Sequence, residues 1–235
     1  MCFECAQLSR RHFLRSAAAG ASAVALPMWP RASFAAAEPD VNAEDALTRL
    51  ESGNEKYVEA PQLCVIDPAG SRSKSATGQK PWAIVLTCSD SRVVPEIIFG
   101  GLDVGELFVV RDAGNIASVE ALGSIEYAAE HLGARLIVVL GHNRCGAVSA
   151  AVDVVTKNAR LPGNIKTMVD SIVPAVRAVK GKPGDMVDNA VRENARLMAS
   201  KVGSSAIVAE LVKHDHAKIV YGRSDLDSGA VEFLG

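Results

Sequence analysis

The sequence has no block of basic residues beyond its N-terminus, and its 25 lysines and arginines nearly balance 27 aspartates and glutamates. With a formal net charge of -2, nothing favours a nucleic-acid or anionic-membrane partner, and a small-molecule or protein partner is expected. The sequence also has no internal repeat. Its 235 residues, 49% of them hydrophobic, therefore predict one substantial core.

The chain also lacks an apolar run that would serve as a membrane anchor. The apolar stretch Ser16–Pro27 is far too short to span a hydrocarbon core of about 30 Å. Before it, residues 9–15 (SRRHFLR) resemble the twin-arginine consensus, and small residues suited to cleavage follow. We predict that residues 1–37 are a signal removed near Ala35 or Ala37, and that the twin-arginine export machinery carries the folded protein to the periplasm. The alternative is an ordinary basic N-terminus before an alanine-rich linker.

Cysteine is scarce once that signal is removed. Cys2 and Cys5 leave with it, and the three that remain, Cys64, Cys88 and Cys145, cannot form a disulfide framework. In an oxidising compartment a thiolate site needs protection, which a metal loaded before export would provide. Cys64 has no predicted role: it is either buried or oxidised with its counterpart in a second subunit.

The rest of the pattern is typical of an open, mostly parallel α/β sheet flanked by helices. Residues 38–80 read as an N-terminal arm, helical over 42–60 and then a polar loop over 66–81. Residues 81–235 form the predicted catalytic domain. It begins with three short β-branched runs that favour parallel strands covered on both faces, at 83–88, 105–112 and 135–142. Further helices are predicted at 118–133, 146–158, 166–179 and 186–214, the last with a potential break at 202–207, before a final strand or hairpin over 218–234.

Ligands of open α/β sheets bind at the carboxyl ends of the strands, where this sequence places metal-binding side chains. Cys88 ends the first run, His142 ends the third, and Cys145 follows His142 by three positions. Three protein ligands with one position left open are typical of catalytic zinc, although another tetrahedral metal remains an alternative. Each feature alone is more often a coincidence or a small buried hydrophobe, so the argument depends on their combination.

Asp90 and Arg92 lie two and four residues after Cys88. A carboxylate beside an arginine keeps a lowered pKa and remains an acceptor, which could orient a metal-bound water or occupy the fourth metal position. An ordinary loop salt bridge is the alternative for this pair taken by itself.

The sequence resembles the β-class carbonic anhydrases through five segments: CSDSR, HNRCG, GELFVVRDAGNIA, SIEYAAEHLG and LIVVLGH. The resemblance runs from about Leu50 to the C-terminus. The resemblance implies a zinc enzyme with a parallel sheet, an obligate dimer or higher assembly, and Zn²⁺ held by Cys88, His142 and Cys145. It also implies that Asp90 and Arg92 act as a catalytic dyad.

The plant-type branch of that family is similar in its substrate pocket. The resemblance implies that Gln79 bonds the substrate, that Phe108 and Tyr127 form an aromatic wall contributed by the neighbouring subunit, and that Gly146 also contacts the substrate. The tryptophan of the bicarbonate-inhibited branch is replaced by Val85, so the inhibitory site of that branch is expected to be missing. Asp112 stands where the family usually has asparagine, which changes the local charge.

The predicted function is reversible hydration of carbon dioxide to bicarbonate by metal-bound hydroxide, with activity that rises with pH because two thiolates offset the charge of the metal. One alternative is hydrolysis of carbon disulfide or carbonyl sulfide on the same fold. Another is a non-catalytic zinc-binding module, which would not need Asp90, Arg92 or Gln79. His131 matches a proposed family proton shuttle, but a surface role is favoured for it, as for His214 and His216.

Overall fold

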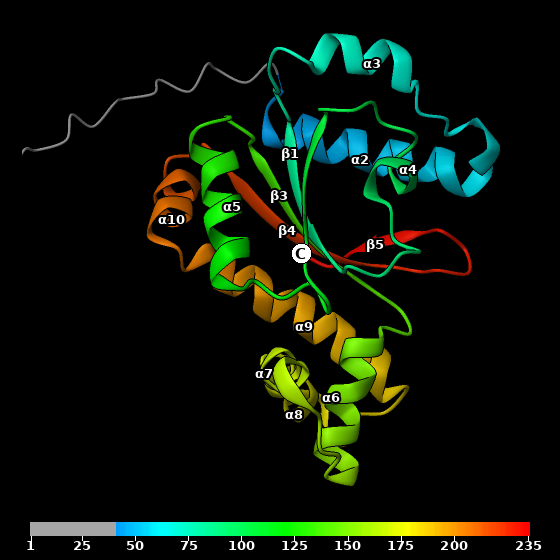
Figure 1. The fold of residues 1–235 in the computed structure, drawn as a ribbon, viewed down its shortest axis with the longest axis vertical. Coiled ribbons are helices and arrows are strands. Elements are labelled where there is room, and N and C mark those ends of the chain that lie inside the picture. Colours follow the sequence, from blue (N-terminus) through cyan, green and yellow to red (C-terminus); the bar gives the residue numbers. More distant parts are fainter. Residues whose placement is uncertain (1–40) are drawn as a thin grey trace, which may run out of the picture. The chain divides into compact units, whose positions relative to one another are not determined.

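A five-stranded sheet with the order β2-β1-β3-β4-β5 lies at the centre of residues 41–235, the part of the chain that the computed structural model describes (Figure 1). The strands are β1 (Ala83–Thr87), β2 (Leu107–Arg111), β3 (Leu136–His142), β4 (Lys218–Ser224) and β5 (Val231–Phe233). The first four are parallel and β5 is antiparallel to β4. The predicted open, mostly parallel sheet is confirmed. The predicted export signal lies outside the described residues and stays a prediction.

Both faces of the sheet are covered by helices, which is why the central strands β1 and β3 are buried along their whole length. On β1, Ile84 and Leu86 belong to a core with α5 (Val119–Glu130) and α9 (Met186–Gly203), whereas Ala83 and Val85 belong to a second core with α2 (Ala43–Glu59) and α4 (Pro95–Ile98). Successive side chains of a strand point to opposite faces, so one short run of sequence contributes to both cores.

The other helices follow the predicted order with two interruptions. They are α6 (Gly146–Lys157), α7 (Gly163–Asp170), α8 (Val173–Val179) and α10 (Ala206–Lys213). The segment predicted as one helix over 166–179 is divided between α7 and α8. The break expected in 202–207 is present: α9 ends at Gly203 and Ser205 caps α10 by accepting a hydrogen bond from the Val208 amide. No helix of residues 41–235 is long and apolar enough to cross a membrane.

The N-terminal arm contains a helix that was not predicted. α2 occupies the predicted helical segment and the short 3₁₀ turn η1 (Pro61–Leu63) follows it, but Pro68–Ser75, predicted as loop, forms the helix α3. The Asp67 carboxylate caps it, accepting from the amides of Ala69 and Gly70, and Pro68 occupies the first turn. These two N-terminal signals outweigh the poor helix propensity of the glycine and serines that follow them.

The strand order determines where a ligand is expected. The chain passes from β1 outward to β2 and then crosses back to β3 on the other side of β1, so the direction of strand addition reverses between β1 and β3. The carboxyl ends on either side of such a reversal border the crevice in which open α/β sheets bind ligands. Cys88 follows β1 directly and His142 is the last residue of β3.

Candidate metal centre

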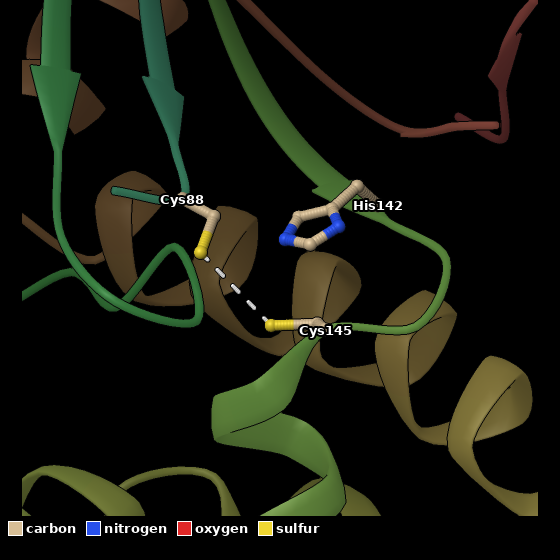
Figure 2. Close-up of side chains that lie close together, drawn as sticks. All are labelled: Cys88, His142 and Cys145. Carbon is tan, nitrogen blue, oxygen red and sulfur yellow. Dashed lines mark hydrogen bonds between the residues drawn. The ribbon is translucent and has the colours of Figure 1, made fainter. Parts of the chain in front are cut away.

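Cys88, His142 and Cys145 meet at that crevice (Figure 2). One ligand atom from each side chain lies within 4.8 Å of the others, and the two Sγ atoms are 4.0 Å apart. All three residues are buried, with His142 fully so. His142 ends β3 and Cys145 occupies the N-cap position of α6, so the short connection between β3 and α6 places both ligands. The structure therefore brings together the three ligands predicted from sequence.

The imidazole of His142 is oriented for coordination. Its Nδ1 lies 2.8 Å from the carbonyl oxygen of Asn143, and because a carbonyl can only accept, Nδ1 carries the proton. Nε2 is then the unprotonated nitrogen. It is buried and has no hydrogen-bond partner among the described residues. A metal ion bound by the lone pair of Nε2 would remove the cost of this unpaired group.

The loop that carries Asn143 is anchored to the C-terminal hairpin. The Asn143 amide N–H donates to the Ser224 carbonyl (3.1 Å), and its side chain accepts from the Leu226 amide (2.8 Å) and donates to Asp225 (3.0 Å). The carbonyl that orients His142 is therefore held by β4 and the loop after it. Residues of the hairpin therefore help to fix the orientation of a metal ligand.

The two thiols influence one another strongly. Hydrogen bonding from Cys145, helped by His142 and Gly114, lowers the pKa of Cys88 to about 4 against the opposing effect of burial. The same contact with Cys88, together with burial, raises the pKa of Cys145 well above its usual range. The protein alone thus favours one thiolate and one thiol. A divalent cation between the sulfurs is what would stabilise two thiolates there, so the donor set fits zinc.

Asp90 is held by Arg92 in a fork of two hydrogen bonds, with Nε to Oδ1 at 2.9 Å and Nη2 to Oδ2 at 2.8 Å. The Arg92 backbone amide adds a third at 3.0 Å. These bonds, with a smaller contribution from His142, place the pKa of Asp90 well below its usual range. Asp90 Oδ2 is also 3.8 Å from His142 Nε2, so the carboxylate borders the metal centre while both its oxygens are engaged by the arginine. This favours an orienting role over occupation of the fourth metal position.

Two residues of the site were not identified from sequence. The Arg111 guanidinium donates to the carbonyls of Cys88 (3.2 Å) and Asp90 (2.5 Å), and so fixes the loop after β1. The Gly114 amide donates to Cys88 Sγ at 3.2 Å. Both residues lie in a segment that carried the family resemblance, but their contacts cross 23 and 26 positions, and no local pattern specifies them.

The predicted substrate residues lie apart from the metal centre within one chain. Gln79 precedes β1, at the opposite end from Cys88, and lines a surface pocket with α3 and the loop before β2. Phe108 pairs with Ile84 near the beginning of β1, and its ring centroid is 6.3 Å from that of Tyr127 on α5. Gly146 is different: it is the first residue of α6 and follows Cys145 directly, and a Cβ added at this position would have no atom of another segment within 4 Å.

The remaining candidates have ordinary surroundings. Cys64 is buried and forms no disulfide within residues 41–235, and its oxidation with the counterpart in a second subunit stays a prediction. The His131 ring lies 5.6 Å from that of Tyr127, on the exposed side of α5. His214 pairs with Glu210 at 2.8 Å on the surface. The Asp112 amide donates to the carbonyl of Thr87, the last residue of β1. The Asp112 carbonyl accepts from the Asn115 amide and so closes the turn after β2.

The fold and the donor set define a class: a metal-binding α/β protein with three protein ligands at a strand-end crevice. Residues 83–231 match the family model described as carbonic anhydrase. Carbonic anhydrase 2 of Mycobacterium tuberculosis is 34% identical over 192 residues, which span 81% of this chain and 92% of that protein. The carbonic anhydrase of Mycolicibacterium smegmatis is 37% identical over 138 residues, or 59% of this chain and 66% of that protein. This chain belongs to the β-class carbonic anhydrase family.

Solved structures show the same fold. The β-carbonic anhydrase CcaA matches with a TM-score of 0.63 at 24% identity, covering 81% of this chain and 95% of that one. One of two tetrameric β-carbonic anhydrases from Sordaria macrospora matches with a TM-score of 0.62 at 23% identity, with the same coverage.

Proposed function

We propose that the protein catalyses the reversible hydration of carbon dioxide to bicarbonate and a proton, with zinc held by Cys88, His142 and Cys145. The observation that carries this proposal is the buried His142 Nε2, which has no hydrogen-bond partner among residues 41–235 and lies beside two buried thiols. When bound, zinc supplies a Lewis acid that lowers the pKa of water toward neutrality and so provides the nucleophile. Membership of the carbonic anhydrase family makes carbon dioxide the expected substrate.

The protein side of the mechanism begins with Asp90. Because Arg92 keeps the pKa of Asp90 far below neutrality, the Asp90 carboxylate stays ionised and cannot store the proton released in hydration. It can accept a hydrogen bond from the attacking water and direct the oxygen lone pair toward the substrate carbon. Arg92 keeps the carboxylate in that orientation, and the released proton must leave to solvent or buffer by another group.

A second subunit would complete the substrate pocket. The resemblance to the plant-type branch implies that Gln79, Phe108 and Tyr127 line the substrate pocket. None of the three lies at the metal centre of its own chain. The rings of Phe108 and Tyr127 are neighbours at the edge strand β2, and 47% of Tyr127 is exposed. A homodimer or larger homo-oligomer that places this surface beside a neighbour's Cys88 would complete the site. Sedimentation equilibrium is expected to give at least a dimer, and a fully active monomer would contradict this assignment.

The function is tested by stopped-flow assay of the zinc-quantified protein, with carbon dioxide and, in parallel, carbonyl sulfide and carbon disulfide. We expect hydration of carbon dioxide that rises from about pH 6.5 to 9, because two thiolates make the bound metal a weaker acid. Hydrolysis of the sulfur compounds without hydration would instead support the sulfur-substrate alternative. Stoichiometric zinc with no activity on any of the three would leave the non-catalytic zinc module.

A further inference from the structure

Three buried side-chain atoms of residues 41–235 have no hydrogen-bond partner: His142 Nε2, Asn115 Nδ2 and Asn194 Oδ1. The lone pair of His142 Nε2 would be used by the metal ion of the proposed site. Unpaired buried polar groups are rare and cost stability, so the other two point to a requirement that packing alone does not impose. Both amides belong to residues around Gly114, whose backbone N–H contacts the sulfur of Cys88.

Asn194 reaches this glycine from the middle of α9. Its side chain is fully buried, and its Nδ2 donates to the carbonyl oxygen of Gly114 at 2.8 Å, across 80 positions of sequence. Gly114 in turn donates its own N–H to Cys88 Sγ at 3.2 Å. One residue thus receives a hydrogen bond from α9 and gives one to a metal ligand.

The segment that carries Gly114 needs such an anchor. Gly114 has a φ of +74°, and Asn115, the next residue, has a φ of +46°. Two consecutive residues in the left-handed region are unfavourable for an L-residue such as Asn115, and they persist only when the surroundings fix them. Asn194 lies on the long helix α9, and its hydrogen bond to the Gly114 carbonyl holds this turn next to the Cys88 sulfur.

We propose that Asn194 is a positioning residue of the metal centre, which acts through Gly114 to keep a hydrogen bond on Cys88. This inference rests on the proposed zinc site. The N–H···S bond draws negative charge from the Cys88 sulfur, which lies only 4.0 Å from that of Cys145. It therefore reduces the repulsion between two thiolates when both bind the same cation. Replacement of Asn194 by an apolar residue would remove the unpaired Oδ1. It would also remove the Nδ2 group that donates a hydrogen bond to the Gly114 carbonyl.

The test is the zinc affinity of Asn194→Leu, measured by competition with a chelator of known affinity. Leucine is similar in size and cannot donate. We expect the dissociation constant for zinc to rise by about 10- to 100-fold, the range for loss of a residue that supports a ligand. The matched control is Asn54→Leu, because Asn54 is also buried and donates its amide to the carbonyls of Ile98 and Gly229, in the core on the other face of the sheet. Its zinc affinity should change by less than about threefold.

A spectroscopic measurement separates positioning from general destabilisation. In the cobalt-substituted protein, the sulfur-to-cobalt charge-transfer absorption should shift for Asn194→Leu and not for Asn54→Leu. If circular dichroism shows that Asn194→Leu does not fold, Asn194→Ser, too short to reach Gly114, is measured in its place with the same expectation. A folded variant with the parent's zinc affinity and absorption would overturn the inference. Failure of the unmodified protein to bind zinc would instead overturn the proposed function.

Discussion

Replacement of Cys145 by serine is expected to remove zinc binding at stoichiometric concentrations and to reduce carbon dioxide hydration by about 1000-fold or more, because the nucleophile depends on the metal. A serine hydroxyl is a hard, protonated ligand that cannot replace a thiolate for zinc. The fold should survive, since Cys145 is the N-cap of α6 and serine is among the preferred residues at that position. Zinc content, hydration rate and thermal unfolding of the same preparation check all three expectations.

Cys64→Ser is the matched control for this variant. Cys64 is also buried and not part of a disulfide, but it lies in the N-terminal arm at the end of η1. It should retain full zinc content and activity. If Cys145→Ser kept the zinc content and rate of the parent, the assignment of the three ligands would be wrong.

Asp90→Asn is expected to keep zinc and lower kcat/KM by about 100- to 1000-fold, the range for loss of one group that stabilises the transition state. Arg92 donates to both oxygens of Asp90, and an asparagine offers only one acceptor to that fork. The amide would therefore turn, and the oxygen that borders His142 Nε2 would be displaced or replaced by a donor. Metal content and kcat/KM are measured together, so that loss of zinc is distinguished from loss of orientation.

Glu193→Gln provides the control for breaking a carboxylate–arginine fork. Arg196 donates to both oxygens of Glu193, at 3.0 and 2.6 Å, on the surface of α9. This variant should have the activity of the parent within about twofold, since surface pairs of this kind contribute little. Equal losses in Asp90→Asn and Glu193→Gln would show that the effect of Asp90 is not specific to the site.

The sequence predicts most of what lies close together along the chain. Cys88 and His142 were placed at strand ends because the apolar runs before them are short and continuous, and the structure has β1 and β3 in those places. The strand order then brings the two ends together, as expected for a parallel sheet. The predicted loop over Pro68–Ser75 was wrong because the Asp67 cap and Pro68 stabilise a helix despite the serines and glycine of that segment.

Contacts between distant segments were not predictable from pattern. Asn194 follows the helical spacing of α9 like any other residue, and nothing local indicates that its amide meets Gly114. The same is true of Arg111 and of the hydrogen bonds by which Asn143 joins the C-terminal hairpin. Gln79, Phe108 and Tyr127 were identified only by resemblance, and a single chain does not place them at the metal.

The complete burial of β1 has a consequence for how such a protein can change over evolutionary time. Its five residues are enclosed by two cores and leave little freedom for substitution, since any change in volume affects one face or the other. At the strand ends the metal ligands are buried as well, but positions beside them, such as Ser89 and Ser91, are exposed and have fewer packing constraints. Mutation can therefore reshape access to the metal, and with it the choice of small substrate, while the framework that holds the ligands is inherited unchanged.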